Sequence, residues 1–336
     1  MMLAARRGVS AKSYVAMRYW YPFTEDALTA IKQDGIERLV VLPLYPQFSI
    51  STSGSSLRLL EREFYADQAL RQIRNVVIPA WYNREGYVNA CARLIARKCD
   101  LAEDKDAPHI FFSAHGVPVK YIEALADPYQ KQTEATVGFV MNALKRMGYK
   151  NDHTLAYQSK VGPVEWLTPS TDDTIKELAG VGVSQLVVVP ISFVSEHIET
   201  LEEIDGEYRE LAEEEGIHWW ERVPALGTDG EFIDDLADAV MEVLPNLDSP
   251  PKSDINEGRP VSLRVVNDLV QLRGKEEEIE YGPVRYEVRR VGFTPKAELI
   301  NGRIAMMAIT IASGLAAYDG ELLTDVLDGR IPKFFF

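Results

Sequence analysis

Cysteine is scarce in this chain, and its scarcity excludes several kinds of site. Only Cys91 and Cys99 are present. They form no CxxC pair that could bind zinc and no set of four thiolates that could hold an iron–sulfur cluster. Because both lie on one predicted helix, we expect them to pack in a protein core within a reducing compartment.

Basic residues are few relative to acidic ones. The chain carries 36 Lys and Arg against 51 Asp and Glu, which gives a net charge of -15. Nucleic acid binding needs a basic surface, so no nucleic acid partner is expected. The 336 residues, 46% of them hydrophobic, are enough for two globular units with their own cores.

Apolar runs long enough to cross a bilayer are absent except at residues 299–318. Twenty residues suffice to span the hydrocarbon region. A buried core helix is the alternative, but the charged linker predicted at 246–291 precedes the run and leaves no domain to bury it. We therefore expect a transmembrane helix within 292–320, followed by a tail at 321–336.

The chain repeats itself. Residues 24–43 read "TEDALTAIKQDGIERLVVLP" and residues 171–190 read "TDDTIKELAGVGVSQLVVVP", and seven of the twenty positions are identical without a gap. Each copy predicts a capped helix, a glycine turn and a continuous apolar strand, which is typical of a parallel strand buried on both faces. A second match, between the stretches that begin at Pro79 and Pro224, leads into another helix in each copy.

The second copy opens with a strand that the first copy lacks. That strand is "HIFFSAHG" at 109–116, and its counterpart would lie before Met1. The first residues of the chain, "MMLAARRGVSAKSY", show a faint likeness to a transit peptide. Residues 14–22 are expected to form the next strand. The sequence thus predicts an α/β fold of two similar doubly wound parallel-sheet halves, 1–100 and 101–245, with a cleft between them.

Polar residues collect where the predicted strands end, which is where doubly wound sheets bind ligands. His115 follows one apolar strand, and His197 and Glu199 follow another. On a helix Glu199, Glu203 and Glu207 would share one face with His197 near its start, because side chains four residues apart are neighbours. A solvated acidic helix is the alternative; a path for a divalent cation is the reading that the histidines favour.

These residues make the chain resemble the ferrochelatase family over residues 12–245. The matching stretches, in order, are "RYWYPFTEDA", "LYPQFSISTSGSS", "FFSAHGVP" with "DPYQKQ", "AYQSKVGPVEWLTP" and "PISFVSEHIETLEEID". The resemblance implies a chelatase-like fold and insertion of Fe²⁺ into protoporphyrin IX, with iron as substrate. The family's opening "LLNLGGP"-type strand is not found, in agreement with the repeat.

The resemblance also implies roles for the residues at the strand ends. His115 would accept pyrrole protons, and Glu199 would act as the second catalytic group across the pocket. The metal path would be formed by His115, Glu199, His197, Glu203 and Glu207, on a helix that in the family is partly of the π type. Arg18, Tyr19, Tyr45, Ser51 and Trp166 match pocket residues that would hold the porphyrin ring and its propionates, although each alone could be a packing residue.

The tail resembles the chlorophyll a/b-binding motif. "FTPKAELINGRIAMM" at 293–307 contains Glu298, Asn301 and Arg303 at the motif's spacing. The resemblance implies chlorophyll magnesium on Glu298 and Asn301, with Arg303 paired to a glutamate of a second helix. That pairing favours a homodimer or a related partner helix.

Charge around the apolar run predicts its orientation. Arg and Lys precede it and Asp and Glu follow it, so the positive-inside tendency places the catalytic part on the stromal side of a plastid thylakoid, or on the cytoplasmic side in a cyanobacterium. The sequence therefore predicts a thylakoid-anchored ferrochelatase. An inactive or regulatory tetrapyrrole-binding protein is the alternative, because of the missing strand, and a chelatase for cobalt or another tetrapyrrole is a third.

Overall fold

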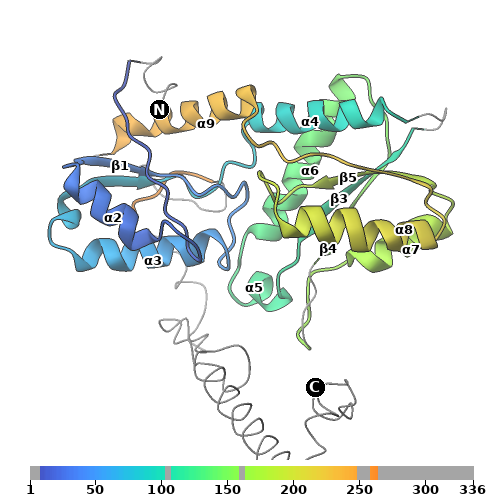
Figure 1. Cartoon of the computed structure of the whole chain (residues 1–336), viewed down its shortest axis with the longest axis horizontal. Coiled ribbons are helices and arrows are strands. Elements are labelled where there is room, and N and C mark those ends of the chain that lie inside the picture. The colour runs from blue at the N-terminus through green and yellow to red at the C-terminus, as the bar shows by residue number, and fades with distance from the viewer. Residues whose placement is uncertain (1–7, 103–106, 159–162, 248–257, 264–336) are drawn as a thin grey trace, which may run out of the picture. The chain divides into compact units, whose positions relative to one another are not determined.

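The computed structural model describes residues 8–102, 107–158, 163–247 and 258–263, and these contain two parallel β-sheets flanked by helices (Figure 1). A sheet of two strands belongs to the first half of the sequence, and a sheet of four strands, in the order β4-β3-β5-β6, belongs to the second. The expected α/β class with parallel sheets is confirmed.

The first half runs as helix, strand, helix, strand, helix. Its apolar strands pair in parallel, with Val40 opposite Val76 and Val41 opposite Val77. The elements are α2 (Thr24–Gln33), β1 (Arg38–Val41), α3 (Ser53–Ala66), η1 (Leu70–Gln72), β2 (Arg74–Val77) and α4 (Glu85–Cys99).

The second half repeats this order and adds two strands before it. β3 lies between β4 and β5, and β5 lies between β3 and β6, all in parallel. The elements are β3 (His109–His115), α5 (Val119–Glu123), α6 (Tyr129–Arg146), β4 (His153–Gln158), α7 (Thr171–Gly180), β5 (Gln185–Pro190), the π-helix η2 (Glu199–Glu207), α8 (Tyr208–Glu214), β6 (Trp219–Arg222), α9 (Gly230–Val243) and η3 (Leu244–Asn246).

The internal repeat is visible in the backbone. The helix and strand of the first copy, α2 and β1, correspond to α7 and β5 of the second. The glycines that match in sequence, Gly35 and Gly182, both have positive φ angles, 63° and 89°. Glycine adopts this left-handed conformation without the steric cost of a Cβ atom, which explains why both copies use it to leave the helix.

The strand expected at residues 14–22 is not formed. Met17 and Phe23 make an isolated bridge, and the rest of the segment has no regular structure. Its counterpart β4 is paired with β3 along its whole length, but no strand equivalent to β3 lies among the described residues of the first half. Without that neighbour the segment has no ladder to join, and β1, unlike the fully buried β5, is only half-buried.

The long helices α4 and α9 connect the two halves. α4, which follows the first sheet in sequence, packs against α6 and β5 of the second half and against α9 (Figure 1). Arg84 at the start of α4 forms an ion pair with Asp235 of α9 at 2.7 Å. α9 in turn leads to Leu244, whose carbonyl accepts a hydrogen bond from Arg38 of the first half at 2.8 Å. The division at residue 100 therefore stays a prediction.

Residues 258–263 pack against the first sheet although they lie inside the predicted linker. Val261 and Val77 exchange both backbone hydrogen bonds, at 2.7 and 2.9 Å, in an antiparallel bridge. Val261 and Leu263 are fully buried in the first half's apolar core. This part of the chain is thus held in place by burial and hydrogen bonding, not suspended as a tether.

The predicted transmembrane helix lies outside the described residues, as do Glu298, Asn301 and Arg303. Within the part of the chain that the structure describes, no helix combines the length and apolar character needed to cross a bilayer.

Candidate active site

His115 ends β3, at the carboxyl edge of the four-stranded sheet, as the sequence predicts. Its backbone N–H donates to Ser192 Oγ at 3.1 Å, and its carbonyl oxygen accepts from Tyr129 Oη at 2.8 Å. Tyr129 Oη also lies 2.7 Å from Ser192 Oγ. Both polar groups of the His115 backbone are therefore fixed from two other elements, so the imidazole projects from a rigid base.

Trp166 lies next to Gly116, the residue that follows this histidine, and its place in the porphyrin pocket stays a prediction. A Cβ atom added to Gly116 would lie 3.3 Å from the Trp166 ring and 2.5 Å from the backbone oxygen of Gln158. Glycine is required here, because the chain leaves β3 in close contact with β4. The half-buried Trp166 ring thereby comes directly against the residue that follows His115.

Phe193 packs against both of the predicted histidines. Its ring centroid is 6.3 Å from that of His115 and 4.0 Å from that of His197, edge-on in both cases. His197 is itself fixed, because its N–H donates to Thr200 Oγ1 at 3.0 Å and its carbonyl accepts from the same hydroxyl at 2.8 Å. The structure thus brings the rings of His115 and His197 against the same phenyl ring.

The acidic row begins next to His197, on the π-helix η2. A π-helix of nine residues is unusual, since such geometry occurs mostly as single-turn bulges and frequently at functional sites. Glu203 is half-buried and Glu207 is exposed, as is Glu202. The side chain of Glu199 is outside the described part of the structure, so its predicted position opposite His115 stays a prediction.

Arg222, at the end of β6, braces this helix. Its guanidinium contacts Glu196, which precedes the helix, at 3.0 Å and Asp205, which lies within the helix, at 2.8 Å. Glu196 also accepts from the N–H of Ala225 at 2.9 Å. Burial acts to raise the pKa of Glu196, but hydrogen bonds from Ala225, Thr200 and Arg222 outweigh it and lower that pKa. Glu196 is therefore a structural carboxylate.

Three predicted porphyrin residues of the first half lie together. The Arg18 guanidinium lies 4.8 Å from the centre of the Tyr19 ring and 3.4 Å from Ser55 Oγ. Burial and the nearby Tyr19 raise the pKa of Tyr45, so this phenol stays protonated at neutral pH. Tyr19 is 68% exposed and Tyr45 39%. Large aromatic rings this exposed are available to a flat apolar ligand.

Ser51, the fourth of these residues, is held by the second half of the chain. Its Oγ lies 2.9 Å from Ser49 Oγ, which donates to Asp127 Oδ2 at 2.8 Å. The preceding Phe48 N–H donates to Gln132 Oε1 at 2.8 Å. Burial raises the pKa of Asp127, and hydrogen bonds from Ile50, Ser49 and Tyr129 oppose the rise. Asp127 and Tyr129 thus link residues 48–52, the Ser51 loop, to the groups that support the His115 backbone.

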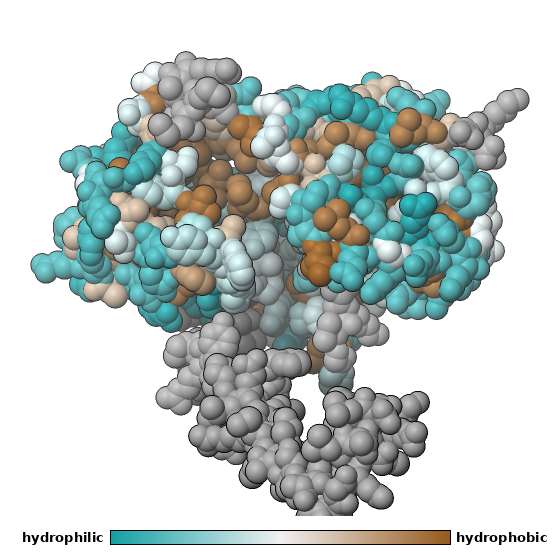
Figure 2. Space-filling model, viewed as in Figure 1, coloured by the Kyte–Doolittle hydropathy of each residue, from teal (hydrophilic) through white to brown (hydrophobic). Residues whose placement is uncertain are grey.

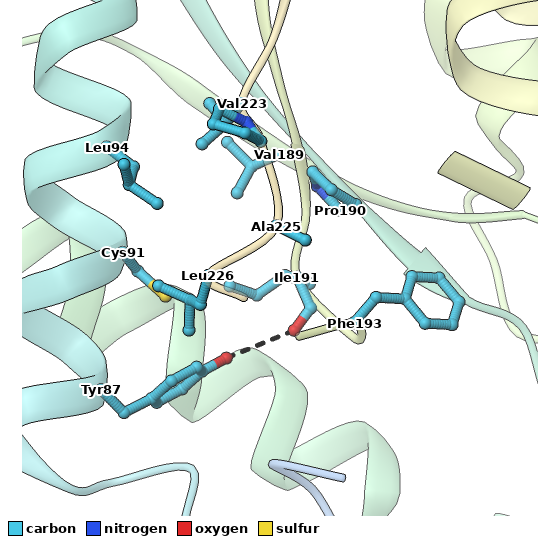
Figure 3. A pocket seen from close by; sticks show the side chains of 11 residues that line it. Tyr87, Cys91, Leu94, Val189, Pro190, Ile191, Phe193, Val223, Ala225 and Leu226 are labelled. Carbon is cyan, nitrogen blue, oxygen red and sulfur yellow. Dashed lines mark hydrogen bonds between the residues drawn. The ribbon is translucent and has the colours of Figure 1, made fainter. Parts of the chain in front are cut away.

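A small cavity of about 20 Å³ lies behind Phe193, between α4 and the end of β5 (Figure 3). Tyr87 and Cys91 line it from α4, and the Phe193 ring points away from it. Such a volume holds about one water molecule. Burial raises the pKa of Cys91 to about 12, so the thiol stays protonated. Both cysteines are buried and free, as expected.

Among the described residues, no three His, Cys, Asp or Glu side chains lie close enough together to hold a metal ion. The predicted set of His115, Glu199, His197, Glu203 and Glu207 includes a side chain that the structure does not describe. It therefore stays a prediction.

The sequence model of the ferrochelatase family matches residues 2–244. The chain belongs to the ferrochelatase family. It is 52% identical to Ferrochelatase-2, chloroplastic, of Oryza sativa subsp. indica over 317 residues, which are 94% of this chain and 60% of that protein. It is also 52% identical to the ferrochelatase of Trichodesmium erythraeum over 330 residues, 98% of this chain and 77% of that protein. The chain thus spans about 60% of the length of its plant relatives.

A solved structure has a similar fold. SirB from Bacillus subtilis with Fe³⁺ aligns with a TM-score of 0.53 at 15% identity, covering 74% of this chain and 87% of that one. At this identity the likeness supports the fold alone.

Several residues of the candidate site were not singled out by sequence reasoning. Phe193 and Ser192 follow β5 directly, and Arg222 ends β6, so the strand-end rule that selected His115 could have found them. Asp127 and Tyr129 lie in the "DPYQKQ" stretch, which was noticed only as a family motif. Their hydrogen bonds reach over long sequence separations that no spacing rule describes.

Proposed function

We propose that this protein inserts Fe²⁺ into protoporphyrin IX to give protohaem, the last step of haem biosynthesis. The observation that carries the proposal is that the rings of His115 and His197 both pack on the Phe193 ring, at centroid distances of 6.3 and 4.0 Å, with His197 two residues before the acidic π-helix. An imidazole base and a row of carboxylates are the groups that metal insertion needs.

The chemistry divides between the two sides of the site. Insertion requires that two pyrrole protons leave the ring while a divalent ion enters. His115, held at both ends of its backbone, accepts the protons. His197 and the glutamates Glu199, Glu203 and Glu207 exchange the water ligands of the incoming ion for imidazole and carboxylate oxygen.

Aromatic side chains and one arginine make the porphyrin contacts in this proposal. Tyr19, Tyr45 and Trp166 pack on the macrocycle, and Arg18 pairs with a propionate. Arg18 is prepared for this contact because the Tyr19 ring and Ser55 already orient it.

The tail supplies a membrane anchor in this proposal. Residues 292–320 cross a thylakoid membrane with the catalytic part on the stromal side, or the cytoplasmic side in a cyanobacterium. Glu298 and Asn301 have the hard oxygen ligands that suit chlorophyll magnesium. Arg303 favours pairing with a second such helix, which makes the protein a homodimer or the partner of a related helix. The support is the sequence motif and the printed names of plastid and cyanobacterial relatives.

Turnover by the purified full chain tests the proposal. Insertion of Fe²⁺, or of Zn²⁺ as a surrogate, is followed by the porphyrin absorption change in the parent and in His115→Ala. We expect metal insertion by the parent and a loss of at least a hundredfold in the variant. His153→Ala, an exposed histidine at the start of β4, is the matched control and should keep full activity. Porphyrin binding by the parent without any turnover would instead support the tetrapyrrole-binding alternative.

A further inference from the structure

Asp127 is a buried carboxylate that joins the two halves of the molecule without belonging to the histidine pair or the acidic row. It is 3% exposed. Its Oδ2 atom accepts from the Ile50 N–H and from Ser49 Oγ, both at 2.8 Å, and its Oδ1 atom accepts from the Tyr129 N–H at 3.0 Å. Three donors on one carboxylate fix the Ser51 loop against the start of α6.

The hydrogen bonds of this cluster determine which way the hydroxyl groups point. Ser49 has one hydroxyl hydrogen, and it is directed to Asp127. The contact of 2.9 Å between Ser49 Oγ and Ser51 Oγ must therefore use the hydrogen of Ser51. The backbone N–H of Ser51 also donates to Ser49 Oγ, at 3.3 Å. With its only hydrogen directed inward, the half-buried Ser51 presents oxygen lone pairs to its surroundings.

We propose that Asp127 is a positioning residue that makes Ser51 a hydrogen-bond acceptor toward the porphyrin. The inference rests on the proposed function, which places Ser51 in the porphyrin site. At neutral pH the propionates of protoporphyrin IX are acceptors, and its donors are the inner pyrrole N–H groups. A metalloporphyrin has lost both of these inner N–H hydrogens and keeps its propionates. Ser51 therefore favours the metal-free substrate over the metallated product, and it does not bind a propionate.

Binding of two porphyrins to the full chain tests this assignment. Fluorescence titrations with protoporphyrin IX and zinc protoporphyrin IX are compared for the parent, Ser51→Ala and Ser49→Ala. We expect Ser51→Ala to weaken binding of the metal-free ring three- to tenfold, the usual effect of one hydrogen bond, and to leave zinc protoporphyrin binding unchanged. Ser49→Ala should reduce the preference for protoporphyrin IX over zinc protoporphyrin IX, because the Ser51 hydroxyl is then no longer held inward.

Ser53→Ala is the matched control. Ser53 is a fully buried serine two residues after Ser51, at the first position of α3, and its Oγ has no hydrogen-bond partner among the described residues. Loss of this hydroxyl should change neither affinity. A merely structural effect on the loop would instead appear in all three serine variants and for both porphyrins.

Asp127→Asn tests the carboxylate itself. The amide has one acceptor oxygen, whereas the two carboxylate oxygens of Asp127 accept three hydrogen bonds. The variant should therefore lose the preference for metal-free porphyrin, as Ser49→Ala does. The double variant Asp127→Asn with Ser51→Ala should bind protoporphyrin IX no more weakly than the single variant with the larger effect, since Asp127 acts through Ser51. Where Asp127→Asn does not fold, Ser49→Ala still decides.

Two results would overturn the proposal. One is equal weakening of both porphyrins by Ser51→Ala, and the other is a Ser49→Ala variant that behaves like the parent. Failure of the parent to bind either porphyrin is a different result, because it overturns the proposed function and not the hydrogen-bond assignment alone.

Discussion

The rings of Phe193 and His197 meet edge-on, with their centroids 4.0 Å apart and an angle of 79° between their planes. The same phenyl ring lies 6.3 Å from His115, and Figure 3 shows it turned away from the small cavity beside α4. Phe193 therefore fixes the side-chain orientation of one histidine at the end of β3 and of another at the start of the π-helix.

Replacement of Phe193 tests this role. Phe193→Ala should lower kcat about tenfold or more and change the KM for porphyrin little, because the histidines keep their backbone supports but lose the ring that orients them. Steady-state kinetics with Zn²⁺ and Fe²⁺ measure this. Phe139→Ala removes an exposed phenylalanine of α6 that stacks on Tyr82, and it should leave kcat unchanged. Equal kcat values in the two variants would contradict the role.

The acidic π-helix predicts a difference between neighbouring glutamates. Glu203 is half-buried on the expected metal path and Glu202 is exposed. Glu203→Gln should raise the KM for the metal about three- to tenfold and leave the KM for porphyrin unchanged, because one carboxylate attraction is lost. Glu202→Gln removes the same charge next to it and should have a smaller effect that disappears at high salt. An identical effect of both variants would point to general surface charge.

Arg222 predicts a pH dependence of stability. The pKa of Glu196 is lowered in the folded protein, so its contribution to stability is present above the ordinary value of 4.5 and is lost as the pH falls through the folded value. Arg222→Met should cost about 1–3 kcal/mol at pH 7, because Arg222 is largely buried between two carboxylates. The variant should also lose less further stability than the parent between pH 6 and about 3.5.

Denaturant unfolding at several pH values measures this effect. Arg209→Met is the control, because its ion pair with Glu213 is exposed on both sides. That variant should lie within about 0.5 kcal/mol of the parent at every pH. Parallel stability curves for Arg222→Met and the parent would show that Glu196 does not depend on this arginine.

The segment after α9 should contribute to the stability of the first half. Leu263→Ala removes a fully buried side chain from the core beneath β1 and β2, and we expect a loss of about 2–4 kcal/mol. Val181→Ala, at a position 79% exposed, should change the free energy of unfolding by no more than about 0.5 kcal/mol. If Leu263→Ala melts like the parent, the segment is not part of the folded unit.

Apolar side chains next to the acidic row in sequence are exposed to solvent. Figure 2 shows apolar side chains on a face that is otherwise largely hydrophilic. Ile198 and Leu201, which flank Glu199 in sequence, are 67% and 55% exposed. Apolar side chains beside the acidic row are consistent with a flat apolar ligand that a metal ion must reach.

Much of this molecule could be predicted from the sequence because its signals are local or repeated. Continuous apolar runs after a glycine-ended helix predicted β1 and β5, and the repeat predicted that both halves share their order. His115 and His197 were found because parallel strands collect their carboxyl ends at one edge. The prediction of a strand at 14–22 was wrong. The segment matches β4 in its apolar pattern, but a strand also needs a neighbouring strand with which to pair.

The sequence by itself determined the class of fold, the family and the histidines and acids that carry the proposed chemistry, since each depends on residue type at short spacing. Only the tertiary structure decided what holds those residues: Phe193 against two imidazoles, Arg222 against the π-helix, Asp127 beneath the Ser51 loop and Leu263 in the first core. Most of these contacts join residues far apart along the chain. They exist because packing and the burial of polar groups select partners by position in space, which no local pattern encodes.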